Sequence, residues 1–145
     1  MITAVIREYL LQAPGVTAMV GDRVYIDELP RDPVFPAISI HPVYQAPDWR
    51  YNGGHADTIQ VSLWDNPPPD REGRKSSLTL EKLRHEVITR MHHGAIGDWA
   101  SLAKTVDGVV IQIHGMRITG GSRVHDPVRG WLHVPLTARI AFLTR

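Results

Sequence analysis

The sequence contains no cysteine, which excludes disulfide bonds and thiolate metal sites. It has no apolar run close to the roughly 20 residues that a membrane-spanning helix needs. Its charges are nearly balanced, with a formal net charge of +1 at pH 7. A chain with so small a net charge has no global field that attracts nucleic acid or an anionic membrane. We therefore expect no membrane partner and no strong electrostatic binding of nucleic acid.

The short motifs of common enzyme classes are absent too. There is no Gly-x-Ser-x-Gly elbow, no P-loop, no dinucleotide-binding G-x-G-x-x-G and no HExxH. Of the eight histidines, His41, His114 and His133 fall on predicted strands, opposite to the apolar side chains. They could share an outer face, but their spacing is not that of a known ligand motif. We expect no metal, no cofactor and no enzymatic activity; a histidine-dependent hydrolase remains the alternative.

The length and composition of the chain are typical of a folded domain. Its 145 residues are 43% hydrophobic and 21% charged, so a core can be buried within one domain spanning residues 1–145. Helical spacing of apolar residues predicts a first helix that Pro14-Gly15 ends, followed by a short apolar turn over 16–20. A second helix begins near Ser76 or Ser77. The predicted buried faces are Ile2, Val5, Ile6, Tyr9 and Leu10, and then Leu80, Leu83, Val87 and Met91.

Period-two alternation predicts the strands, most clearly at the end of the chain. From Leu132 to Phe142 every second residue is apolar, which indicates a long strand with one face on a core. Shorter strands are expected at 24–26, 37–41, 58–64 and 109–116, and a loop over 95–108. Pro42 and Pro135 have no backbone N–H to donate, so we expect them at sheet edges or β-bulges and not within a central ladder. The order predicts an α+β fold, with two layers and helices on one face of a largely antiparallel sheet.

Several short sequence patterns, each present once, follow one another along the chain. They are Ala13-Pro14-Gly15-Val16 at the end of an amphipathic helix, Val20-Gly21-Asp22-Arg23-Val24-Tyr25, Leu29-Pro30, Phe35-Pro36-Ala37-Ile38, Ile59-Gln60-Val61-Ser62-Leu63-Trp64, a central helix, and Asp126-Pro127-Val128-Arg129-Gly130-Trp131. The ordered set resembles the small tail-completion or tail-terminator proteins of long-tailed bacteriophages and prophages, the head-tail joining family.

The resemblance implies a structural protein of the virion tail or neck, assembled in the host bacterial cytoplasm. It implies a homo-oligomeric ring, typically a hexamer, that caps the tail tube and meets the head connector, or stopper, protein. DNA would pass through the central channel without sequence-specific binding.

Aromatic residues outside the predicted core are the candidates for an assembly interface, although Trp49 could instead cover a sheet edge. Trp49-Arg50-Tyr51 lies among turn-forming residues, and its side chains are types that anchor protein interfaces. Trp64 and Trp131 lie on the faces opposite to the core, which suggests that another subunit covers the outer sheet surface. The alternative is a small nucleic-acid-binding module that uses Arg50, Arg71, Arg74 and Lys75.

Overall fold

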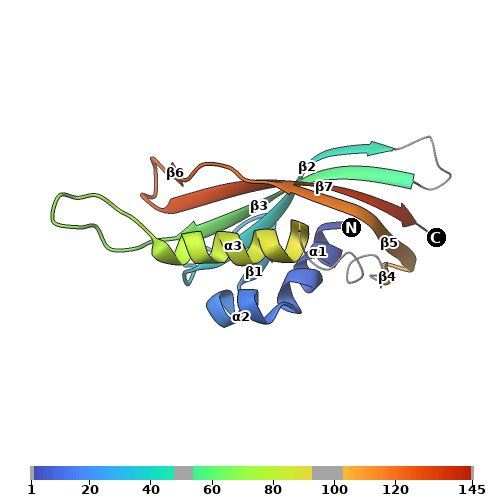
Figure 1. Ribbon diagram of the computed structural model, residues 1–145, viewed down its shortest axis with the longest axis horizontal. Helices are drawn as coiled ribbons and strands as arrows, with labels where there is room; N and C mark the ends of the chain where they lie inside the picture. Colours follow the sequence, from blue (N-terminus) through green and yellow to red (C-terminus); the bar gives the residue numbers. More distant parts are fainter. Residues whose placement is uncertain (1, 48–53, 93–102, 145) are drawn as a thin grey trace.

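The computed structural model describes residues 2–47, 54–92 and 103–144, which form a curled sheet with helices on one face (Figure 1). The helices are α1 (Ile2–Leu11), α2 (Pro14–Val20) and α3 (Leu78–His92). The strands are β1 (Val24–Ile26), β2 (Ala37–Pro47), β3 (Gly54–Asp65), β4 (Ala103–Val106), β5 (Val109–Thr119), β6 (Val124–His125) and β7 (Leu132–Thr144). This confirms the predicted α+β fold.

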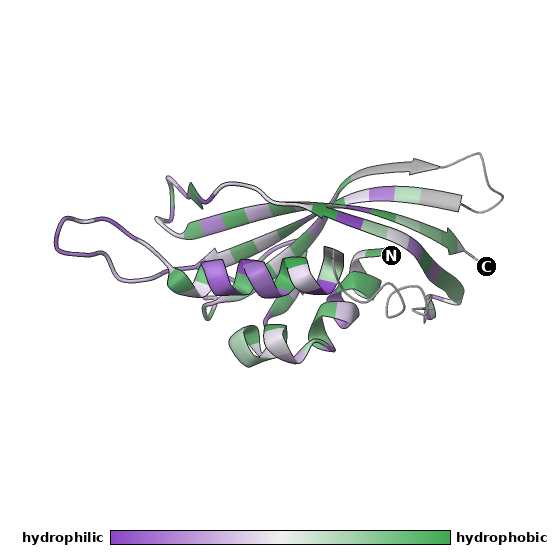
Figure 2. Cartoon of the chain, viewed as in Figure 1, coloured by the Kyte–Doolittle hydropathy of each residue, from purple (hydrophilic) through white to green (hydrophobic). Residues whose placement is uncertain are grey.

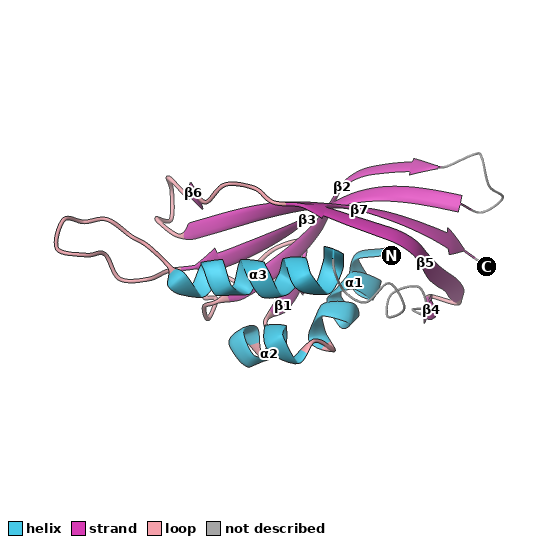
Figure 3. Ribbon diagram, in the orientation of Figure 1, coloured by secondary structure: helices cyan, strands magenta, loops and turns pink. Residues whose placement is uncertain are grey.

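The sheet has the order β1-β2-β3-β7-β5-β4, and β6 pairs with the first two residues of β7, Leu132 and His133. Every pairing is antiparallel except that of β1 with β2, which is parallel. α3 contacts β3 and β5, while α1 contacts β1, β2 and β4. Figure 3 shows the helices below the sheet and none above it. The sheet therefore has one covered face and one outer face.

The core lies between the sheet and the helices, and neighbouring strands contribute to it in register. One row of Cα partners joins Ile40, Val61 and Leu136, all fully buried. The alternation of apolar and polar residues along these strands is visible in Figure 2. Both predicted helical faces are confirmed as buried: Ile2, Val5, Ile6, Tyr9 and Leu10 in α1, and Leu80, Leu83, Val87 and Met91 in α3.

Three elements were not predicted: α2, β4 and the two-residue strand β6, which lies in the polar stretch before β7. Residues 14–20 form α2 rather than a turn, because Pro14 occupies the first helical position, where its missing donor costs nothing. Val16 and Val20, one helical turn apart, are buried. The loop predicted over 95–108 contains β4, which pairs with β5 across Asp107-Gly108. Both turn residues have positive φ, 51° and 80°, and Asp-Gly is a strong hairpin signal that the prediction missed.

The two strand prolines occupy different environments. Pro42 does not end β2, but β1 pairs only as far as Ile40, so beside Pro42 no other described strand pairs with this side of β2 and it is open there. Pro135 lies in the central strand β7, contrary to the prediction of an edge or bulge. It is tolerated because β6 pairs only with residues 132–133 and β5 only with residues 137–144. In that gap Gly121 packs on the Pro135 carbonyl, where a Cβ would come within 2.1 Å.

Candidate functional site

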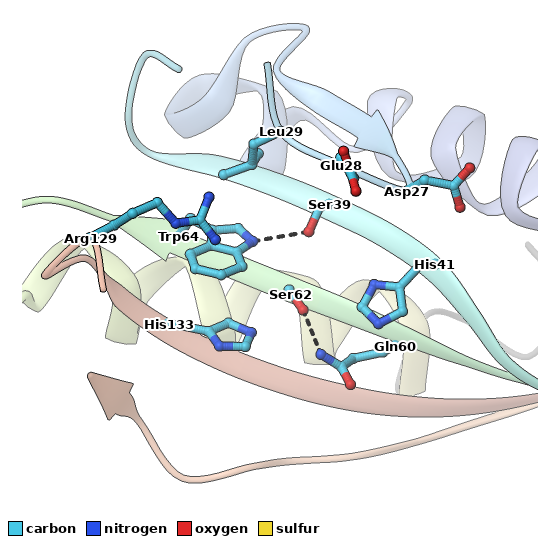
Figure 4. Close-up of a pocket in the computed structure, with 10 residues that line it drawn as sticks. All are labelled: Asp27, Glu28, Leu29, Ser39, His41, Gln60, Ser62, Trp64, Arg129 and His133. Atoms are coloured by element: carbon cyan, nitrogen blue, oxygen red, sulfur yellow. Dashed lines mark hydrogen bonds between the residues drawn. The ribbon is translucent and has the colours of Figure 1, made fainter. Parts of the chain in front are cut away.

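A hollow of about 380 Å³ opens on the outer face of the sheet. We call it the outer hollow. β2, β3 and β7 form its floor, and the segment after β1 forms one rim (Figure 4). Its lining residues are Asp27, Glu28, Leu29, Ser39, His41, Gln60, Ser62, Trp64, Arg129 and His133.

Aromatic rings form one wall of the outer hollow. Trp64 stacks on His133, with ring centroids 4.1 Å apart and planes 3° apart. Trp131 meets Trp64 edge to face at 6.1 Å, and Phe35 meets Trp131 edge to face at 4.9 Å. The register explains this proximity, because Trp64 and His133 are direct Cα partners. Edge-to-face and stacked rings fix one another's orientation, so the wall is a built surface.

The aromatic wall is also tied to the floor of the outer hollow. The indole Nε1 of Trp64 donates to Ser39 Oγ at 2.9 Å, and the Gln60 amide donates to Ser62 Oγ at 2.9 Å. Ser39 and Ser62 are buried although their strand positions face outward. Each hydroxyl thus bonds to another side chain, and within the described residues neither bonds to a histidine. The outer hollow lacks the serine–histidine hydrogen bond that activates a hydroxyl nucleophile.

His133 is the least satisfied polar group of the described residues, because its Nε2 is buried without a hydrogen-bond partner there. Burial lowers the pKa of His133 below its ordinary value of 6.5, since a charged imidazole loses water there. His41 and Arg129 lower this pKa further, while Asp126 raises it. The ring is therefore neutral at pH 7, and one ring nitrogen is available as a hydrogen-bond acceptor.

A tight turn before β7 positions the cation of the outer hollow. The Asp126 carboxylate accepts hydrogen bonds from the backbone N–H groups of Val128 and Arg129, at 2.9 and 3.0 Å. These bonds are the main reason that the pKa of Asp126 is lowered. Asp126 also pairs with Arg129 Nε at 3.2 Å, and the guanidinium lies 4.4 Å from the Trp131 ring centroid. The turn motif singled out in the sequence therefore has a local structural role.

The opposite rim is acidic. Asp27 and Glu28 follow β1 and are exposed, and within the described ranges no cation pairs with either carboxylate. Asp27 has φ 69°, and its N–H donates to the Ile40 carbonyl at 2.7 Å, which fixes the rim beside β2. The outer hollow thus has two free carboxylates, whereas its one cation is already paired with Asp126.

The structure brings together some of the predicted interface residues. Trp64 and Trp131 are in contact, as their shared outer face predicted. Trp49, Arg50 and Tyr51 lie outside the described residues. Phe35 and Arg129 were missed as site residues, although both belong to patterns already noted, Phe35-Pro36 and Asp126-to-Trp131.

In the part of the chain that the structure describes, the histidines do not form the cluster that a hydrolase or a metal site would need. The basic residues Arg74 and Lys75 are already bonded within the chain. His41 and His133 share the outer hollow, whereas exposed His114 does not line it. Within the described ranges, no three histidine or acidic side chains gather closely enough to hold a metal ion. Arg74 pairs with Asp70 and Glu72, and Lys75 bonds to Asn66 and the Gly130 carbonyl. The described helices also include none suited to cross a membrane.

The comparisons with known proteins indicate the class to which this fold belongs. Residues 4–66 match the family described as tail completion protein gp17. This region runs from α1 to the start of the segment after β3 and includes the Gly21-Asp22-Arg23 turn. The resemblance to phage tail-completion proteins is thereby confirmed, and it supports a structural protein of a phage tail.

The fold also matches known structures, of which 26 chains are similar. One is a chain of the virion of a native gene transfer agent particle, with a TM-score of 0.69 and 17% sequence identity. The alignment covers 98% of this chain and 94% of that one, so the two folds correspond over nearly their full length. No match is found among curated proteins.

Proposed function

We propose that this chain assembles as a homo-oligomeric ring of six copies, which caps the tail tube and joins it to the head connector. Residues 1–145 act as one structural, non-enzymatic domain in the neck of the virion. DNA passes through the ring without sequence-specific contacts, consistent with a net charge of only +1. Assembly takes place in the host cytoplasm before heads and tails join.

One observation carries the self-assembly part of this proposal. The outer face of the sheet carries the Phe35–Trp131–Trp64 row of rings, and no described helix covers it (Figure 3). Aromatic residues and arginine are enriched at the buried centres of protein interfaces. Covering this face with another subunit removes apolar area from water, which favours association. The family match supports a phage-tail setting for this assembly.

The proposal is tested by the mass of the purified protein, measured by sedimentation over a range of concentrations, alone and mixed with its tail tube protein. A ring on its own or at tube ends, seen by electron microscopy, is the expected result. A chain that stays monomeric under both conditions and leaves tube length unchanged overturns it.

A further inference from the structure

A loop between β3 and α3 projects away from the body of the molecule (Figure 1). We call residues Asn66–Ser76 the arm; it is largely hydrophilic (Figure 2). Three consecutive prolines, Pro67 to Pro69, stiffen its first half, since each fixes its own φ. With 11 residues going out and back, the tip reaches at most about 20 Å beyond the body.

The tip of the arm is ordered by its own hydrogen bonds. The Asp70 carboxylate accepts from the N–H groups of Glu72 and Arg74, at 2.9 and 2.8 Å, and the Asp70 N–H donates to the Arg74 carbonyl at 2.7 Å. Arg74 pairs with both acidic side chains. A tip that is already ordered loses little conformational entropy when it binds, which favours binding.

These contacts leave one cation of the arm unused. Arg71 is exposed at the tip, and its guanidinium makes no hydrogen bond or ion pair within the described ranges. A guanidinium offers five donors and no acceptor, and it stacks on aromatic faces. A partner for Arg71 therefore needs several acceptors beside an aromatic ring.

The outer hollow has that chemistry. Asp27 and Glu28 present carboxylates without a paired cation in the described structure, and the Gln60 amide uses its nitrogen on Ser62, which leaves its oxygen as an acceptor. The buried Nε2 of His133 has no partner there. The ring of Trp64 forms the aromatic wall.

We propose that the arm of one copy inserts Arg71 into the outer hollow of a second copy, against Asp27 and Glu28. The lowered pKa of His133 supports this, because a neutral imidazole does not repel the incoming guanidinium. The arm and the outer hollow are different surfaces of one chain, so their contact is heterologous. Repetition of a heterologous contact closes a ring when the rotation between copies is suitable. The inference rests on the proposed ring and names the contact that would build it.

Engineered cysteines test the contact directly, because the natural chain has none. An Arg71→Cys variant is mixed with a Glu28→Cys variant under mild oxidation, and disulfide-linked dimers are separated by mass. The expected result is at least about a tenfold excess of the mixed dimer over either homodimer, since docking raises the local concentration of this pair of thiols. A Lys82→Cys variant, on the opposite layer, is the matched control and should give no excess with Arg71→Cys.

Charge reversal provides a second measurement. Arg71→Glu should raise the concentration for half-assembly by about tenfold or more, and Glu28→Arg on the same chain should restore much of the loss. Lys82→Glu, which makes the same change in net charge, should leave assembly unaltered.

The outcomes separate this inference from the proposed function. If the natural chain forms rings but the mixed dimer shows no excess, or Arg71→Glu assembles normally, the arm contact is wrong and the ring stands. If the natural chain stays monomeric alone and at tube ends, and no mixed dimer forms, both are wrong.

Discussion

The imidazole of His133 lies flat on the indole of Trp64, with ring centroids 4.1 Å apart. The two residues belong to neighbouring strands and are direct Cα partners in the sheet. Cross-strand ring pairs of this kind stabilise a sheet from its outer side. Trp64 therefore contributes to the stability of the single chain as well as offering a surface for assembly.

Replacing Trp64 tests that contribution. Trp64→Ala removes the stack on His133, the contact with Trp131 and the donor to the Ser39 hydroxyl. We expect the free energy of unfolding to fall by about 2–3 kcal/mol, less than for a fully buried tryptophan. Denaturant titration measures it, with Trp64→Phe as the control that keeps a ring and loses less. An unchanged midpoint for Trp64→Ala would contradict the stabilising role.

The pKa of His133 predicts a pH dependence of stability. Burial lowers this pKa in the folded chain, so between the folded pKa and about 6.5 the unfolded chain binds more protons. The stabilisation is fully present above about pH 6.5 and is lost as the pH falls through the folded pKa. His133→Phe keeps a ring on Trp64 without a titrating group. Its melting temperature should fall less than that of the natural chain between about pH 7.5 and about pH 5. The exposed His114, changed to Gln, is the control and should keep the natural dependence.

The packing of α3 gives the simplest test of the core. Leu83 is fully buried, whereas Leu78 in the same helix has 65% of its surface exposed. Leu83→Ala should lower the free energy of unfolding by about 2–5 kcal/mol, because it leaves a cavity under the sheet. Leu78→Ala should change it by less than about 0.5 kcal/mol. Equal effects in a denaturant titration would mean that the buried face of α3 is assigned wrongly.

The start of α3 offers two adjacent serines that the sequence could not rank. The structure selects Ser77, whose hydroxyl accepts from the Leu80 N–H at 2.9 Å and contacts Asp65 Oδ2 at 2.5 Å. Ser77→Ala should cost about 1–2 kcal/mol of unfolding free energy, as expected for a lost helix cap. Ser76 is exposed, so Ser76→Ala should leave the stability nearly unchanged. Thermal melts of the two variants measure the difference. The reverse order of the two variants would contradict the assignment.

The segment Trp49-Arg50-Tyr51, outside the described residues, remains a predicted assembly element. The double variant Trp49→Ala/Tyr51→Ala should keep its circular dichroism spectrum, because the sequence predicts turn-forming residues around both positions and not a core element. It should lose ring formation, since each aromatic at an interface is expected to contribute about 2 kcal/mol or more. In phage complementation it should give heads and tails that fail to join. Normal rings and normal joining would leave the outer face around Trp64 and Trp131 as the better candidate.

Sequence patterns predicted the parts of the fold whose side chains follow one long period. The alternation from Leu132 to Phe142 identified the central strand, and the helical spacing of Leu80 to Met91 identified the buried face of α3. α2 and β4 were missed because each is short: seven and four residues show too little of a period. Their signals were local, Pro14 at a helix start and Asp107-Gly108 in a hairpin.

The site was predictable only in part, for a physical reason. The parity of Trp64 and Trp131 indicated their common face, but strand register decides that Trp64 meets His133. The acidic rim at Asp27 and Glu28 follows a three-residue strand and carries no periodic signal at all. Its position beside the sheet depends on the parallel pairing of β1 with β2, a long-range contact that local patterns do not contain.

The open side of β2 has a consequence for how growth of the sheet is limited. The Ile38 N–H donates to the Arg23 carbonyl just before β1, and the Ile40 carbonyl accepts from the Asp27 N–H just after it. The backbone N of Pro42 therefore lies on the same side of β2, beyond the end of β1. There an incoming strand would find no donor, because proline has none. The chain is proposed to stop growth of the tail tube. Pro42 would also disfavour a second kind of growth, in which copies of this chain pair their sheets edge to edge.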